Sequence, residues 1–221
     1  MKLNKECESC QQRLSLWALF VSLFLSLVKG VVGILGSSES LVVDGLFSFY
    51  QSFVVVRSIF LINRNSAFYK SVWFAGLVIS VMLILGIGDV LIFSVVRMAK
   101  VAKGILLRPS PYALYTAILS VLANQLLYRY SLCSGKEISE KNVSQAEIIQ
   151  SLRLSVIVSS VVVIGIGIAR RVSLYGDAVA ALIVAAIFIP KVISLFNQSL
   201  KVTTDGRLYG FKGIQGIGGH R

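Results

Sequence analysis

The sequence predicts an all-α polytopic membrane protein built around six transmembrane helices, and three observations support this fold class. Of the 221 residues, 56% are hydrophobic and only 14% are charged, and the mean hydropathy is +0.80. A water-soluble domain of this size could not bury so much apolar surface. Six windows approach the roughly 20 apolar residues that cross a bilayer, and most charged residues lie between these windows.

The six windows differ in polarity. The first is interrupted only by Lys29, the third only by Asp89, and the second is the most polar. Pro111 suits the first turn of the fourth helix, whereas Pro190 is expected to kink the sixth or to loosen its packing. The predicted spans are Leu14–Leu35, Leu41–Ile62, Ser71–Val96, Pro111 to about Leu127, Ile148–Ala169 and Asp177–Leu200.

The distribution of basic residues predicts the orientation. Residues 1–13 form a polar tail, residues 14–200 the membrane domain, and residues 201–221 a second short tail. With six spans, 13 Lys and Arg residues fall on the side of both tails and six on the other side. The positive-inside rule therefore predicts two cytoplasmic termini. Because the net charge of +12 comes mostly from bases next to apolar runs, we expect lipid headgroups as partners and no nucleic acid.

The second window carries a polar stripe. Asp44, Ser48, Gln51 and Ser52 follow one another at helical spacing and share one face. Two interpretations stay open, a lined pathway and interhelical hydrogen bonding. Lys29 lies about two turns before the end of the first span, and a short loop makes the first two helices antiparallel neighbours. We therefore predict a Lys29–Asp44 ion pair, since either charge alone would be costly in lipid.

Other polar positions have weaker signals. Ser151, Ser155 and Ser159 in the fifth window predict close helix packing rather than a substrate site, and Ala181 and Ala185 do the same in the sixth.

Cys7 and Cys10 form a CxxC that could supply half a zinc site, although Cys133 and His220 lack a matching spacing. Asp89 could relay protons or pair with a base such as Lys191. No nucleophile–base pair or phosphate loop appears, so neither an enzyme nor a bound cofactor is expected.

Several segments together carry a family resemblance. In KGVVGILGSSESLVVDGLFSFYQSF (Lys29–Phe53), a lysine, a Gly/Ser-rich loop and Ser-x-x-Leu-x-x-Asp precede the second helix. NQLLYRY, Asn142-Val-Ser144 and the segment from Asp177 follow in matching order. The chain thereby resembles the cation diffusion facilitator (CDF) family up to about Gly210. The early CxxC and YRYSLC are most similar to its magnetosome-membrane branch, which is linked to iron handling in magnetotactic bacteria.

The resemblance implies a metal site that this chain has changed. The family holds a divalent cation with His/Asp-x-x-x-Asp pairs on the second and fifth helices, which here fall on Phe47 and Gln51, and on either Ser151 and Ser155 or Arg153 and Ile157. Neither alternative supplies a carboxylate. In the second alternative, Arg153 would repel a dication by about 5 kcal/mol at 6 Å and an effective dielectric near 20. We therefore expect the mid-membrane metal site to be degenerate.

The resemblance also frames the function. A CDF-like bundle without the cytoplasmic domain would sit in a bacterial inner or magnetosome membrane, as a homodimer or a heterodimer with another CDF protein, and handle iron, zinc or manganese as a transport-deficient partner. One alternative is an active efflux transporter with a displaced site at Asp44, Gln51 and Asp89. Another is a membrane-shaping or lipid-binding protein.

Overall fold

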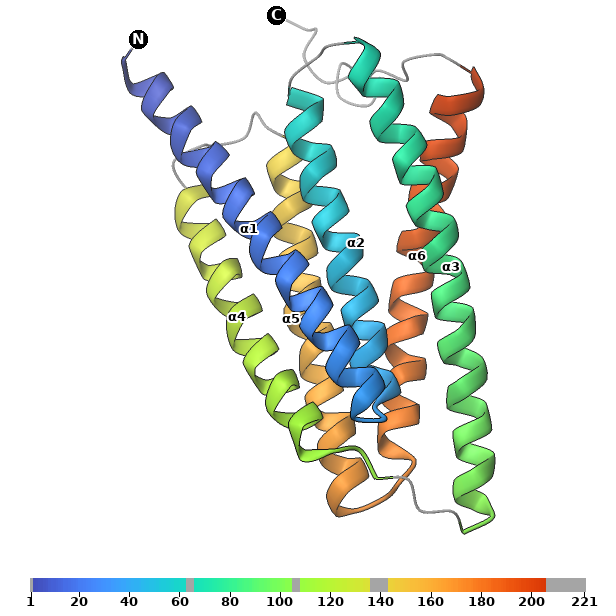
Figure 1. The fold of residues 1–221 in the computed structure, drawn as a ribbon. Helices are drawn as coiled ribbons and strands as arrows, with labels where there is room; N and C mark the ends of the chain where they lie inside the picture. Colours follow the sequence, from blue (N-terminus) through green and yellow to red (C-terminus); the bar gives the residue numbers. More distant parts are fainter. Residues whose placement is uncertain (1, 63–65, 105–107, 136–142, 206–221) are drawn as a thin grey trace, which may run out of the picture.

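The computed structural model describes residues 2–62, 66–104, 108–135 and 143–205, and these residues form six α-helices and no strand. Figure 1 shows the helices running alternately up and down a single bundle. The helices are α1 (Lys2–Leu35), α2 (Glu39–Ile62), α3 (Ser66–Ala102), α4 (Pro111–Gly135), α5 (Val143–Arg171) and α6 (Gly176–Asp205).

The second helix is the centre of the bundle. It contacts α1, α3, α5 and α6, while α4 packs on α1 and α5, and α3 packs on α6. We call the end at which α1 begins and α6 ends the terminal end, and the opposite end, which holds the α1–α2 and α5–α6 connections, the turn end (Figure 1). Because α2 is enclosed, its polar stripe faces protein rather than lipid.

The helices confirm the predicted fold class of an all-α polytopic membrane protein. Five of the described helices are long and apolar enough to cross a membrane, at Trp17–Leu35, Glu39–Arg57, Ser71–Ala102, Ile149–Arg171 and Gly176–Thr204. The exception is α4, which nevertheless lies between α1 and α5 in the bundle. Its outward face carries apolar side chains such as Leu119 and Leu126. The exposed face of α4 is therefore apolar enough to contact the same lipid that surrounds α1 and α5.

The helices extend beyond the predicted spans. The first begins at Lys2, inside the predicted polar tail, and the sixth continues to Asp205. The third reaches Ala102, so Arg97 is helical and only 4% exposed, whereas the sequence placed it in a loop. Helix α6 passes through Pro190 without ending. A window of apolar residues misses these turns because polar residues continue a helix without adding hydrophobicity.

The main core lies where α2, α5 and α6 meet. Phe47, Val162 and Phe188 are fully buried in it. Ala181 and Ala185 on α6 are also fully buried, in the packing positions that their spacing indicates. Large apolar side chains instead cover the outside of α1, α3 and α4, as a bilayer environment requires.

Candidate functional site

A buried ion pair joins the first two helices. The Nζ atom of Lys29 lies 2.9 Å from Oδ2 of Asp44, and both side chains are fully buried. The ammonium also donates to the Ser48 hydroxyl at 2.9 Å and to the Ser159 hydroxyl at 3.3 Å. Three acceptors thus surround the three donors of the lysine. The structure brings together the two charges that the sequence pairs.

The ion pair is the centre of a four-helix polar network. The Ser159 hydroxyl on α5 lies 2.9 Å from Oδ2 of Asp44. From α4, the Asn124 amide donates to Ser159 at 3.1 Å, and the Ser120 hydroxyl lies 3.2 Å from it. Sequence reasoning missed Ser120 and Asn124, although their spacing of four residues was a signal that they share a face. The Lys29 ammonium compensates the charge of Asp44, and the Ser159 hydroxyl also contacts the carboxylate.

The first ligand position that the family resemblance predicts is filled by aromatic packing. Phe47 is fully buried, and its ring lies 5.2 Å from the Phe188 ring in an edge-to-face arrangement. Tyr50 packs against both rings, with centroids 6.1 Å from Phe47 and 5.5 Å from Phe188. We call these three residues the aromatic cluster. A benzyl ring offers no lone pair to a metal ion, so this position contributes packing between α2 and α6 instead.

The second ligand position is polar but uncharged. Gln51 is fully buried, and neither of its amide atoms has a hydrogen-bond partner among the described residues. The buried hydroxyl of Ser155 has none there either. Both residues lie on helices that contact each other. An amide and a hydroxyl can ligate a cation, but they bring no negative charge to offset its dehydration.

The register of α5 corrects one sequence expectation. Ser155 is fully buried and Ser151 is half-buried, whereas Arg153 is exposed and Ile157 is 47% exposed. The Ser151 and Ser155 register therefore faces the bundle, and the Arg153 and Ile157 register faces outward. The electrostatic argument from Arg153 was wrong, because the guanidinium lies on the outside of the helix rather than beside α2.

Two other basic side chains, both half-buried, line a cavity at the terminal end. A cavity of about 130 Å³, the terminal-end cavity, opens between α2, α5 and α6. Arg57 and Lys191 line it together with Phe47, Tyr50 and Ser151. No Asp or Glu occurs among the described residues of its wall. Basic side chains from α2 and α6, rather than Arg153, thus line the same cavity as Phe47 and Ser151.

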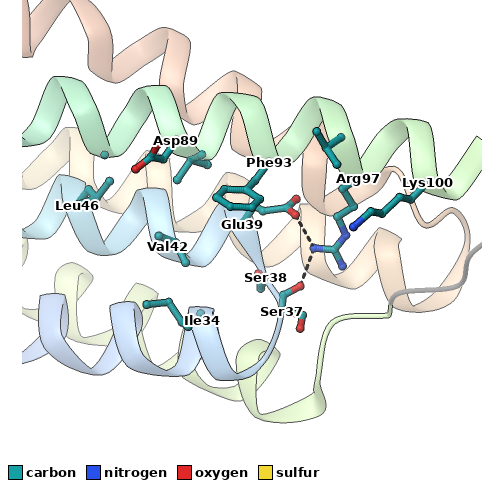
Figure 2. A pocket seen from close by; sticks show the side chains of 14 residues that line it. Ile34, Ser37, Ser38, Glu39, Val42, Leu46, Asp89, Phe93, Arg97 and Lys100 are labelled. Carbon is teal, nitrogen blue, oxygen red and sulfur yellow. Dashed lines mark hydrogen bonds and ion pairs between the residues drawn. The ribbon is translucent and has the colours of Figure 1, made fainter.

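A second charged cluster closes the turn end. Arg97 on α3 donates to Oδ2 of Asp177 at 2.9 Å. It also donates to the Ser37 carbonyl at 2.6 Å, and its guanidinium lies 3.3 Å from Glu39 (Figure 2). Asp177 also accepts from the Ser38 hydroxyl at 2.8 Å. The predicted third span ended at Val96, one residue before Arg97. In the structure it ties α3 and α6 to the α1–α2 turn.

Asp89 lies apart from the central network. It is exposed on α3 and lines a cavity of about 540 Å³ at the turn end, where Figure 2 shows it beside Leu46 and Val42. Lys191 lines the terminal-end cavity instead, so the structure does not bring these two residues together. Asp44 and Gln51 line neither this cavity nor the terminal-end cavity, so the predicted displaced site of Asp44, Gln51 and Asp89 is not gathered around either of them.

The CxxC falls outside what the structure describes. Cys7 and Cys10 belong to α1, but their side chains lie outside the described residues. Among the described side chains, no three His, Cys, Asp or Glu residues come close enough to hold a metal ion.

Sequence comparisons relate the chain to two kinds of protein. It is 28% identical over 142 residues to the magnetosome protein MamB of Magnetospirillum gryphiswaldense, covering 60% of this chain and 47% of MamB. MamB of Paramagnetospirillum magneticum matches to the same extent. The manganese efflux system protein MneP of Bacillus subtilis is 26% identical over 220 residues, covering 92% of this chain and 72% of MneP.

These matches set the scope of the comparison. No protein-family model matches the chain. The chain spans about half the length of the MamB relatives, at 47% coverage. The matches to MamB and MneP, at 26% to 28% identity, support a CDF-like family for this multi-pass bacterial membrane protein.

Proposed function

We propose that this chain takes part in divalent metal-cation transport as a CDF-like membrane subunit that does not itself conduct the ion. It acts as a partner or structural element for a competent relative in the same bacterial membrane. Similarity to a manganese efflux protein and to a magnetosome protein supports the link to metal handling and to a magnetosome or inner membrane.

One observation is the main support for the proposal that the chain does not conduct the ion. Phe47 stands at a ligand position and is locked between Tyr50 and Phe188 in the core. A dication passing between α2 and α5 would meet a ring, an amide and hydroxyls, and none of these carries negative charge. Without a carboxylate partner, the free energy needed to dehydrate such an ion is far larger than the free energy gained from binding to these neutral donors.

The charges around the pathway support the same conclusion. Asp44, the one carboxylate in the polar stripe of α2, is bound to Lys29 rather than available to an ion. At the terminal end an ion would first meet Arg57 and Lys191. Among the described residues no Asp or Glu lines this cavity, which suits a subunit with a structural role.

The active-transporter alternative has less support. It needs Asp44, Gln51 and Asp89 to act on one ion, yet Asp89 faces a different cavity from the one beside Phe47. If wild-type protein catalysed robust uptake that Asp44→Ala abolished, this alternative would replace our proposal.

The decisive experiment restores the missing ligands. The variant Phe47→His/Gln51→Asp/Ser151→His/Ser155→Asp places the family pattern on the inward register of α2 and α5. We expect wild-type protein to bind no Fe²⁺, Zn²⁺ or Mn²⁺ by calorimetric titration and to give no flux in proteoliposomes. The restored variant should gain at least micromolar binding, because imidazole and carboxylate are the donors that transition metals prefer.

A matched control uses the outward register. Arg153→His/Ile157→Asp introduces the same residue types at the exposed positions of α5 and should leave cation binding undetectable. Metal binding by the wild-type membrane domain at midbundle would contradict the proposal.

The partner role has its own test. The chain should co-purify in mild detergent with a co-expressed CDF protein from the same membrane, and a complete failure to associate would contradict that role.

A further inference from the structure

Asp89 carries a charge that no described residue compensates. It lies near the middle of Ser71–Ala102, the part of α3 that is long and apolar enough to cross a membrane. Its carboxylate forms no ion pair or hydrogen bond with any residue that the structure describes. A carboxylate at this depth is costly in lipid, so it is expected to face water, protein or a ligand of opposite charge.

The carboxylate lies in the wall of the cavity of about 540 Å³, which we call the turn-end cavity. The wall is formed by the end of α1, the α1–α2 turn, α2 and α3. Figure 2 shows Asp89 at one end of this space and Arg97 and Lys100 at the other. Ile34 and Phe93 in the wall are 72% and 64% exposed, so the cavity opens to the outside of the bundle. Its volume is in the range of roughly 300–1,000 Å³ that is typical of small-molecule sites.

Between its charged ends the wall is mostly apolar. Val42 and Leu46 come from α2, and Val90 and Phe93 come from α3. These side chains can contact the hydrocarbon part of a ligand, and an aromatic ring also attracts a cation to its face. A hydrated inorganic ion would lose its water here and gain a single carboxylate. An organic cation instead brings apolar surface of its own, so it matches both the wall and the charge of Asp89.

The other charged residues of the wall lie away from Asp89. Glu39 is 3.3 Å from Arg97, and Arg97 also pairs with Asp177 at 2.9 Å, so these three residues form a cluster of their own. Lys100 is exposed and follows Asp89 by 11 residues, which is about 16 Å along a helix. A cation beside Asp89 is therefore well separated from the basic end of the cavity.

The depth of Asp89 favours a free ligand over a lipid headgroup. Asp89 precedes Ala102, the last residue of α3, by 13 residues, which is about 20 Å of helix. Half of the hydrocarbon core of a bilayer is only about 15 Å thick. The amine of a lipid headgroup, held at the membrane surface by its acyl chains, does not reach this depth. A small amphiphile can enter the open side of the cavity with its charged group inward.

We propose that the turn-end cavity binds an amphiphilic organic cation. Its charged group lies at Asp89, and its apolar body lies against Val42 and Phe93. Binding requires neither conduction of a metal ion nor a partner subunit, so the site stands apart from the proposed function.

The test titrates the full chain with two permanently charged cations of different size. Purified protein in a non-ionic detergent is melted at increasing benzyltrimethylammonium or tetraphenylphosphonium, and sodium chloride keeps the ionic strength constant. Ligand binding raises the melting temperature by mass action, so we expect a saturable rise with at least one of the two cations. Benzylsulfonate, an anion similar in size to the smaller cation, should give no such rise.

Two variants locate the cation within the cavity. Asp89→Asn removes the charge and keeps the shape of the side chain, and it should raise the apparent dissociation constant at least about tenfold. Asp89→Ser gives the same test if the asparagine variant does not fold. Lys100→Gln is the matched control, because it removes one charge from the opposite end of the same cavity. This control should bind the cation as tightly as wild-type protein or more tightly.

The remaining outcomes overturn the proposal. These are the absence of a saturable response to either cation in wild-type protein, an equal response to benzylsulfonate, a less than tenfold weakening in the Asp89 variant, and a loss of the same size in Lys100→Gln. Circular dichroism and a single gel-filtration peak show that each variant is folded. No divalent metal is present in these titrations, so their result does not depend on the proposed function.

Discussion

At the scale of single residues, the central polar network depends on mutual neutralisation. Lys29 and Asp44 are 2.9 Å apart and wholly buried, and Ser48 and Ser159 complete the shell of the lysine. Removing one partner leaves an uncompensated charge, whereas removing both leaves only neutral groups. The pair therefore restricts which substitutions the bundle tolerates.

This asymmetry gives a prediction. Lys29→Met should destabilise the folded protein by about 3–5 kcal/mol, because Asp44 is then buried without its cation. Lys29→Met/Asp44→Asn should cost clearly less than Lys29→Met alone. Unfolding in mixed micelles as a function of denaturing detergent measures both. Arg153→Gln, on the exposed side of α5, serves as the control and should change stability by less than about 0.5 kcal/mol. If the single and double variants lost the same free energy of unfolding, the buried ion pair would not be the cause of the destabilisation.

Whether a contact can be predicted from the sequence depends on how far apart its two residues lie along the chain. Lys29 and Asp44 are 15 residues apart on antiparallel neighbours, so local reasoning could pair them. Arg97 and Asp177 lie 80 residues apart, on helices that only the tertiary structure brings together. The inward face of α5 was equally hidden, because the outside of a membrane helix is as apolar as its inside and periodicity cannot separate Ser155 from Ile157.

At the scale of helices, α5 packs closely on α6 because Gly165 has no side chain at their contact. A Cβ atom added to Gly165 would overlap the Cβ atom of Ala180 and come within 3.0 Å of the Gly176 carbonyl. Gly167, two residues further along α5, has nothing within 4 Å of the same position. The two glycines therefore form a matched pair that differs only in its neighbours.

Gly165→Ala should thus destabilise the bundle by about 1–3 kcal/mol, because the two backbones have to separate. Gly167→Ala should be neutral or slightly stabilising, since alanine favours a helix over glycine by about 1 kcal/mol. Thermal unfolding of both variants in the same detergent checks the difference. If the two alanines had the same effect, close contact between α5 and α6 would not explain the glycine.

The helix ends show what hydropathy alone can predict. The six apolar windows located all six helices, because the membrane-spanning part is a composition signal. They missed the polar turns, such as the last turns of α3, which carry Arg97 and Lys100. These turns hold Arg97, which contacts Asp177 and Glu39 at the turn end, so a part of the helix with little hydrophobic signal carries a tertiary contact.

At the scale of the whole molecule, α4 decides the topology. Five helices qualify as spans by length and composition, and α4 does not. It nevertheless packs along α1 and α5 and supplies Ser120 and Asn124 to the central network. If α4 stayed outside the bilayer, α5 and α6 would have to cross in the reverse sense, and the distribution of basic residues would no longer favour the side on which α1 begins.

Fusions to alkaline phosphatase, which is active only outside the cytoplasm, test this arrangement. With two cytoplasmic termini and a membrane-spanning α4, fusions after Lys103 and after Ser173 should be active. Fusions after Gly135 and after Asp205 should be inactive, and green fluorescent protein at the same two sites should fluoresce. Activity after Gly135 together with inactivity after Ser173 would mean that α4 does not cross. If all four results were reversed, the protein would have the opposite orientation in the membrane. The bundle would be the same, but Arg57 and Lys191 would lie toward the outer side.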